Sequence, residues 1–391
     1  MLEYFNGNRI TLLKSGAEYF PQLEAEIDAA WHEIHLETYI FAADATGRAV
    51  AAALARAAQR GVAVFVLVDG FGSQDLDPGL VRQMKEAGVN FLVYRPNISA
   101  WSLRHARLRR LHRKIAVMDA RVAFVGGINI LDDADRPGDT APRFDYAVRV
   151  EGPMLSKIHP VVKWLWRLVS TTQLRARPPG STRLVPSMEI RGRQRAAFVT
   201  RDNLGHRREI EKAYLEAIGQ AREEILIANA YFFPGQPFRR ALKEAAARGV
   251  RVILLLQGRV EYVLQHYASR ALYGAFLDAG IEIHEYHKSF LHAKVAVIDR
   301  HWATVGSSNI DPFSLLLARE ANVVTKDEGF AAQLRQSLLA EMREGSAQVR
   351  RESWSRQPWT VRVFTWFFYG LARLLTGLFA YGRAREFTEE R

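Results

Sequence analysis

The chain of 391 residues contains no cysteine, which excludes a disulfide framework and any cysteine-based zinc site. It also lacks a secretory signal, because residues 1–16 have no apolar segment behind a basic start. Both absences are typical of a protein whose bulk stays inside the cell. Acidic residues are the scarcer charge: 42 Asp and Glu against 54 Lys and Arg give +12, which predicts attraction to nucleic acid or to an anionic membrane face.

One stretch of the chain occurs twice. LHRKIAVMDARVAFVGGINI at residues 111–130 and LHAKVAVIDRHWATVGSSNI at residues 291–310 agree at 11 of 20 aligned positions. Each copy reads His, any residue, Lys, any four residues and Asp, with a Gly 14 and an Asn 17 positions after the His. The chain is therefore a duplication in which each half carries one motif.

The motif residues alternate as they do on a buried strand, because Val, Ile and Ala surround them. Side chains two apart on a strand share a face, so His112 points with Lys114, and His292 points with Lys294. Asp119 and Asp299 have the other parity and stand near the strand end. We expect these two carboxylates to brace the site.

Glycine and asparagine follow each motif at equal spacing. Gly126 and Gly306 end a second strand, where the missing Cβ is expected to let a ligand approach the backbone. Asn129 and Asn309 can then donate to that ligand. Two imidazoles, two ammonium groups and two amides that converge predict a site for a dense anion such as phosphate. Two structural strands with histidines satisfied in the core are the alternative, which retention of the spacing in both copies disfavours.

The pattern around the motifs predicts an α/β protein. Residues 62–68 and 250–256 are continuous apolar runs, typical of parallel strands covered on both faces, and each follows a helical segment that ends at Arg-Gly. We expect two duplicated α/β/α halves with mixed, largely parallel sheets, packed pseudo-symmetrically around one active site. The first half spans 1–174, a Pro- and Gly-containing linker 175–193, and the second half 194–345.

Two basic or aromatic segments lie outside the repeat. Residues 103–110, LRHARLRR, are predicted to hold anionic head groups at the door of the site, or else to form a solvated helix face. Residues 346–391 are predicted to bind a membrane. Helical spacing places a narrow polar stripe on one side of this segment (Arg362, Thr365, Tyr369, Arg373, Thr376 and Arg383) and a wide apolar stripe on the other (Phe364, Phe367, Phe368, Leu371, Leu374, Leu375, Leu378 and Phe379). This favours an interfacial helix over a transmembrane span or a buried core helix.

The paired motifs resemble those of the phospholipase D superfamily over most of residues 1–345. The runs SSNIDPFSLLLAREANV from residue 307 and DYAVRVEGP from residue 145 are most similar to short bacterial cardiolipin synthases. The resemblance implies that Asp145 and Glu320 each orient the histidine of the opposite half. It also implies transfer of a phosphatidyl group from one phosphatidylglycerol to another, giving cardiolipin and glycerol, at the cytoplasmic face of the bacterial inner membrane.

The residues suit this chemistry. We assign His112 as the nucleophile that forms a phosphohistidine and His292 as the acid and base. The two motif lysines and the two asparagines would hold the non-bridging oxygens, so neither a metal nor a cofactor is expected. A metal-independent phosphodiesterase or nuclease, or a phospholipase D hydrolase of the same superfamily, is the alternative. The aromatic C-terminal segment favours the lipid substrate, and no nucleic-acid partner is expected.

Overall fold

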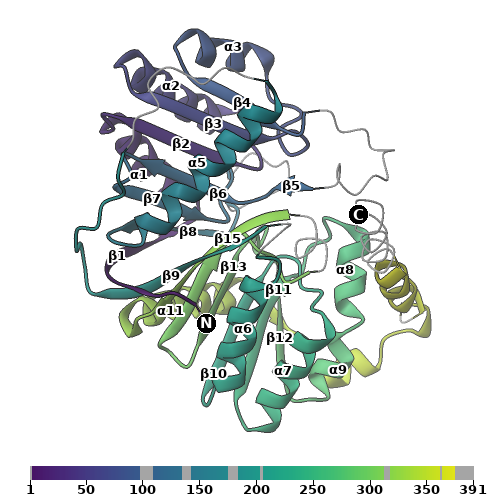
Figure 1. Ribbon diagram of the computed structural model, residues 1–391. Coiled ribbons are helices and arrows are strands. Elements are labelled where there is room, and N and C mark those ends of the chain that lie inside the picture. Colours follow the sequence, from purple (N-terminus) through teal and green to yellow (C-terminus); the bar gives the residue numbers. More distant parts are fainter. Residues whose placement is uncertain are drawn as a thin grey trace, which may run out of the picture.

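Two similar halves lie one above the other in the computed structural model, which describes residues 2–96, 109–133, 142–174, 184–202, 206–311, 318–361 and 363–374 (Figure 1). The first half comprises β1 (Phe5–Lys14), α1 (Ser15–Asp28), β2 (Glu33–Thr38), α2 (Ala45–Gln59), β3 (Ala63–Asp69), α3 (Pro78–Glu86), β4 (Asn90–Tyr94), β5 (Arg110–Leu111), β6 (Lys114–Met118), β7 (Val122–Gly126), β8 (Tyr146–Glu151) and α5 (Leu155–Thr172). The second comprises β9 (Gln194–Arg201), α6 (Glu209–Gln220), β10 (Glu224–Asn229), α7 (Gln236–Ala247), β11 (Arg251–Gln257), α8 (Val263–Arg270), α9 (Tyr273–Leu277), β12 (Glu282–Tyr286), β13 (Lys294–Ile298), β14 (Trp302–Gly306), β15 (Ala318–Lys326), α11 (Glu328–Gly345) and β16 (Ser346–Gln348).

Local signals in the sequence start and stop the helices. Asp44 begins α2 by accepting a hydrogen bond from Gly47 N at 2.8 Å, and Asp327 begins α11 by accepting from Phe330 N at 2.8 Å. Just beyond the end of α2, Gly61 has φ +90°, a conformation that glycine adopts without strain. These caps fix where the helices begin and end relative to the buried strands.

The strands form one continuous sheet in the order β16-β12-β11-β10-β13-β14-β15-β9-β1-β8-β7-β6-β2-β3-β4. The predicted two sheets are thus one, joined where β1 pairs with β9. The prediction of largely parallel sheets also needs correction, because parallel pairing is confined to β2-β3-β4, β10-β11-β12 and the short β5-β15 ladder. The motif strands pair antiparallel, since a tight turn sends each one straight back as a hairpin.

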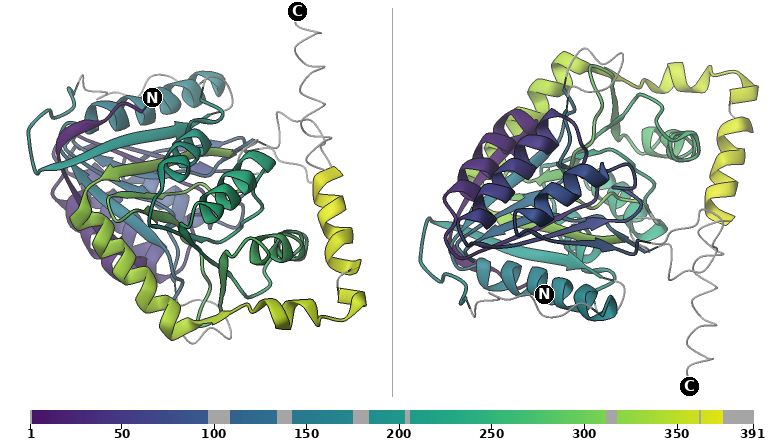
Figure 2. Two further views of the ribbon diagram at one scale, coloured as in Figure 1. Left: turned by 90° about the horizontal axis from the view of Figure 1, so that it is seen from below. Right: turned by 90° about the horizontal axis from the view of Figure 1, so that it is seen from above.

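Helices cover both faces of each half, as the α/β/α prediction requires. In the first half, α1, α2 and α3 share a core with one face of the sheet, and α5 packs against the other. A further core cluster draws on both halves and includes Val117 and Val148 from the first half and Leu226, Val297 and Val323 from the second. The two halves of the sheet therefore share a core. Figure 2 shows the layers of helices and strands from below and from above.

Strand β16 extends the second half beyond the predicted boundary at residue 345. It pairs antiparallel with β12, so residues 346–348 belong to the sheet. The chain then continues through α12 (Arg351–Ser355) into a helix at residues 359–361 and 363–374. No helix in the described part of the chain is long and apolar enough to cross a membrane.

The C-terminal helix lies beside α8 (Figure 1) and rests on the body through part of the predicted polar stripe. Thr365 is 5% exposed, and the ring of Tyr369 lies 5.6 Å from that of Phe233. By contrast, Trp366 and Phe367 are 58% and 63% exposed. Of the predicted apolar stripe, Phe367 and Leu374 face outward, whereas the rings of Phe364 and Phe368 pack against Tyr267 of α8. Of the predicted polar stripe, Thr365 and Tyr369 face the protein. Arg362 and residues 375–391 lie outside the described residues.

Candidate active site

Each motif histidine is tied to the opposite half through its backbone. His112 N donates to Arg319 O at 3.1 Å, and His292 N donates to Phe144 O at 2.8 Å. The residue that follows each of these acceptors is the carboxylate that the resemblance implied, Glu320 or Asp145. The crossing therefore places one carboxylate of each half beside the histidine of the other.

The histidine rings are paired with those carboxylates. His112 Nδ1 lies 2.9 Å and 3.1 Å from the two oxygens of Glu320, and His292 Nδ1 lies 2.6 Å from Asp145 Oδ2. Since Nδ1 carries the proton that the carboxylate accepts, Nε2 of each ring remains to attack phosphorus or exchange a proton. Ser307 Oγ donates to Glu320 at 2.5 Å and Tyr146 N donates to Asp145 at 2.7 Å, which hold the carboxylates in place.

Burial keeps the site close to neutral in its resting form. It lowers the pKa of His112 despite Glu320, and it lowers the pKa of His292 further because Lys294 and Arg143 are near. Burial also raises the pKa of Asp145 to about 7. His112 can therefore be neutral near neutral pH, as a nucleophile must be, whereas His292 must take up a proton before it can act as the acid.

The two lysines point into the same region from their strands. Lys114 Nζ donates to His112 O at 2.6 Å, and Lys294 Nζ donates to His292 O. Burial lowers the pKa of Lys114 to about 7 and that of Lys294 to about 8. A phosphate dianion or diester between them would restore their charge, so their positive charge is strongest when substrate is bound.

The two asparagines are buried beside the motif hairpins, each 4% exposed. Asn129 Oδ1 accepts from Ile40 N at 3.1 Å, which leaves its Nδ2 group as the donor. Asn309 Oδ1 has no hydrogen-bond partner in the described part of the chain. In both amides Nδ2 is the group that could donate to a phosphoryl oxygen.

Asp119 and Asp299 stand at the far end of their hairpins, about 16 Å along the strand from the motif lysines. The Asp119 carboxylate accepts from the backbone of residues 31–33 at 2.8–3.0 Å, and the Asp299 carboxylate accepts from residues 222–224 at 2.8–3.1 Å. Both aspartates also have positive φ in the turn. The geometry makes them braces for the hairpin, with no contact to the reacting groups.

The expectation for the motif glycines was wrong. A Cβ on Gly126 would lie 2.4 Å from Ala147 Cα, and one on Gly306 would lie 2.1 Å from Asn322 Oδ1. The space beside each glycine is therefore filled by the neighbouring strand, not kept open for a ligand. The glycines allow close packing of the strands that carry the carboxylates.

Sequence reasoning missed Tyr39, which follows β2. Its ring lies edge-on to the His112 ring with centroids 4.9 Å apart, and Lys114 Nζ lies 5.4 Å from its centroid. Strands β2 and β10 pair with their motif strands in the same register, which makes Ala230 the counterpart in the second half. Aligning the halves outside the motifs would have revealed this asymmetry.

One cluster among the described residues has the composition of a metal site. Glu33, His35 and His159 bring their ligand atoms within 4.8 Å of one another, at the start of β2. The active site lies at the other end of that strand. Lys163 Nζ also lies 3.1 Å from a Glu33 oxygen, so an ammonium group already neutralises this carboxylate. The basic run at residues 103–110 lies outside the described residues except for Arg109 and Arg110.

The comparisons with known proteins agree with this geometry. The family described as "Cardiolipin synthase, PLD-like domain" matches residues 23–139 and 214–342, one segment in each half. Cardiolipin synthase B of Escherichia coli is 39% identical over 90% of this chain and 85% of its own length, and that of Salmonella typhi is 40% identical over the same shares. A probable cardiolipin synthase of Bacillus subtilis is 32% identical over 86% of this chain.

Solved structures share the fold. A phosphatidylserine synthase from Haemophilus influenzae superposes with a TM-score of 0.70 at 14% identity, covering 96% of this chain and 97% of its own. A polyphosphate kinase from Porphyromonas gingivalis gives 0.58 at 15% identity, covering 95% of this chain and 53% of its own. With two matched segments, relatives of this similarity and paired motifs in one site, the chain belongs to the cardiolipin synthase family of phospholipase D-like enzymes, which are phosphatidyltransferases.

Proposed function

We propose that this chain is a cardiolipin synthase that transfers a phosphatidyl group from one phosphatidylglycerol to a second. The observation that carries the proposal is the pair of cross-half contacts, His112 with Glu320 and His292 with Asp145. Two equivalent imidazoles on one phosphate provide both a nucleophile and a proton carrier. The relatives named for cardiolipin synthesis support the choice of lipid.

The reaction takes two steps with the same groups. His112 Nε2 attacks phosphorus, the bond from phosphorus to the glycerol oxygen breaks, and His292, which enters this step with a second proton on Nε2, gives that proton to the oxygen. A hydroxyl of the second phosphatidylglycerol then loses its proton to His292 and attacks phosphorus. The phosphorus–nitrogen bond breaks, which releases cardiolipin and restores His112. The motif lysines and asparagines would hold the non-bridging oxygens throughout.

The enzyme would work as a peripheral protein at the cytoplasmic face of the membrane. The exposed aromatic side chains of the C-terminal helix supply apolar surface for insertion among head groups. The net charge of +12 adds attraction to anionic lipid. Phosphatidylglycerol would thus be both the substrate and part of the docking surface.

Phosphatidylglycerol labelled separately in its acyl chains and its terminal glycerol tests this function. The purified protein in mixed micelles should yield cardiolipin and free glycerol in equal amounts, and His112→Ala should yield neither. Phosphatidic acid as the main product would identify a hydrolase. Cleavage of DNA without turnover of the lipid would identify a nuclease.

A further inference from the structure

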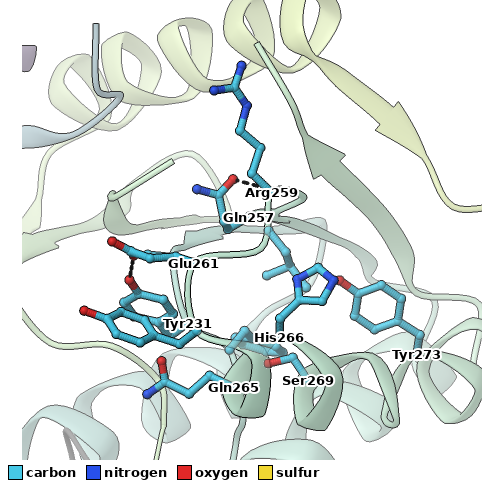
Figure 3. A pocket seen from close by; sticks show the side chains of 12 residues that line it. Tyr231, Gln257, Arg259, Glu261, Gln265, His266, Ser269 and Tyr273 are labelled. Atoms are coloured by element: carbon cyan, nitrogen blue, oxygen red, sulfur yellow. Dashed lines mark hydrogen bonds between the residues drawn. The ribbon is translucent and has the colours of Figure 1, made fainter. Parts of the chain in front are cut away.

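A pocket opens next to the active site in the second half, at the carboxyl ends of β10 and β11. It has about 360 Å³ of space including its mouth. Tyr231, Gln257, Glu261, Gln265 and Tyr273 are among its lining residues (Figure 3). Carboxyl ends of parallel strands are where α/β proteins place ligands, so this location suits a substrate group.

The first half fills the corresponding space beside its motif with a side chain. There the Tyr39 ring packs against His112 and Lys114. The counterpart in the second half is Ala230, which lines the pocket. Where the first half has a tyrosine ring, the second half has only a methyl group, so the two sides of the scissile phosphate differ.

The pocket adjoins the proton-transferring histidine. Gln257 Nε2 donates to Leu291 O at 3.5 Å, the residue just before His292. Glu261 is close enough to Lys294 to counteract the fall in the lysine pKa that burial causes. A leaving alcohol protonated by His292 would therefore extend toward this pocket.

The chemistry of the walls suits a neutral polyol. Tyr231 Oη donates to Glu261, and the rings of Tyr231 and Tyr262 lie 5.6 Å apart. Gln265 Oε1 is buried and has no hydrogen-bond partner among the residues that the structure describes. A carboxylate and an amide oxygen accept hydrogen bonds from hydroxyl groups, and an unpaired buried acceptor gains most from such a donor. Aromatic walls provide apolar contact for the carbon chain.

We infer that this pocket binds the glycerol moiety of the lipid head group, first as the leaving alcohol and then as the attacking one. Glu261 and Gln265 would accept hydrogen bonds from its hydroxyls and so position the reacting oxygen at His292. They would be specificity residues, because they select a polyol over water or a simple alcohol. This inference rests on the proposed phosphatidyl transfer and assigns its acceptor subsite.

The test uses phosphatidylmethanol in mixed micelles as the donor, because methanol is too small to need the pocket. Glycerol and ethanol compete as acceptors at equal concentration, and the initial ratio of phosphatidylglycerol to phosphatidylethanol is measured. Glu261→Gln and Gln265→Leu should each lower this ratio about tenfold. Glu244→Gln, at an exposed position on α7, is the matched control and should leave the ratio unchanged.

The outcomes separate the two proposals. If both pocket variants turn over the donor and keep the wild-type ratio, the pocket is not the acceptor subsite. If one variant fails to fold, the other decides, since the ratio reports only on folded enzyme. If wild-type enzyme makes neither transfer product, the proposed function itself fails.

Discussion

The pKa values of the histidine and lysine side chains in the site are set by two opposing effects, burial and the nearby carboxylates. Burial lowers the pKa of each histidine and each lysine, while Glu320 and Asp145 oppose this at the motif lysines. The empty site is nearly neutral, so folding does not bury several unpaired charges. When phosphate enters, the site becomes cationic and stabilises the bound phosphate. The pH dependence of activity follows from these shifts.

Activity should follow a bell-shaped pH profile. Below the lowered pKa of His112 the nucleophile is protonated, so the acid limb should lie below pH 6.5. On the basic side, Lys114 with a pKa of about 7 and Lys294 with a pKa of about 8 lose their charge as pH rises. We expect kcat/KM to fall between about pH 7 and 8. In kcat the basic limb should move upward, because bound phosphate raises both pKa values. Initial rates on a soluble phosphodiester provide the measurement, and a basic limb above pH 10 would contradict the lowered lysine pKa values.

Glu320→Gln should lower kcat by about 100-fold or more, because the amide no longer stabilises the His112 imidazolium or its tautomer. The acid limb should also shift to lower pH, since Glu320 raises the histidine pKa. A purely structural role would lower the amount of folded enzyme without moving this limb. Asp327→Asn, at the cap of α11, is a control carboxylate in the same half and should leave the limb in place.

Because of these lysines, we expect that turnover does not depend on a divalent ion. Two ammonium groups on one phosphate can supply the charge that a metal supplies elsewhere. Activity on phosphatidylglycerol should survive exhaustive chelation with less than about a twofold change. Loss of activity with chelator and recovery with one equivalent of a divalent ion would contradict this reading.

At the scale of elements, the motif hairpins depend on their aspartates for geometry. Asp299→Ala removes three hydrogen bonds from the backbone of residues 222–224, one of them partly buried, and places alanine at φ +48°. We expect a loss of about 2–3 kcal/mol in the free energy of unfolding. Asp299→Asn should cost less, because asparagine tolerates this φ and keeps one acceptor. Denaturant unfolding measures both, and an unchanged midpoint for the alanine variant would exclude the bracing role.

The C-terminal helix has exposed aromatic side chains, which we expect can be replaced without loss of folding stability. Replacing both Trp366 and Phe367 with serine should strongly reduce co-sedimentation with phosphatidylglycerol vesicles while the melting temperature stays nearly constant. Trp31→Ser is the matched control, because Trp31 is 81% exposed but lies at the opposite end of β2 from the site. Equal loss of vesicle binding in the control would show that general surface hydrophobicity, not this helix, holds the protein on lipid.

The sequence predicted the secondary-structure elements better than the contacts that these elements make with distant parts of the chain. The spacing from His112 to Asp119 defines strand parity and a turn, both of which are local, and the structure has them. The role of Gly126 was misread because the strand that fills its Cβ position lies 21 residues away in sequence at Ala147. The docking of Thr365 was missed for the same reason: the face that a helix buries depends on what its partner offers. The pairing of His112 with Glu320 came only from the family resemblance, since no local pattern links residues 208 apart.

For the whole molecule, the pairing of β1 with β9 joins the two halves into one sheet. The backbone hydrogen bonds from the motif histidines to Phe144 and Arg319 of the opposite halves form one site from both. The carboxylate that pairs with each motif histidine comes from the opposite half. We propose that the asymmetry between Tyr39 and Ala230 gives the halves different roles around one phosphate, with a nucleophile side and an alcohol side.

The covalent intermediate tests this division most directly. Enzyme mixed with a phosphatidyl donor that has an activated leaving group should be quenched in denaturant at alkaline pH, where a phosphorus–nitrogen bond survives, and digested for mass spectrometry. We predict the phosphatidyl group on the peptide that contains His112, with more of it accumulating in His292→Ala and none in His112→Ala. A modified His292 in the wild type, or labelling that persists in His112→Ala, would contradict the account.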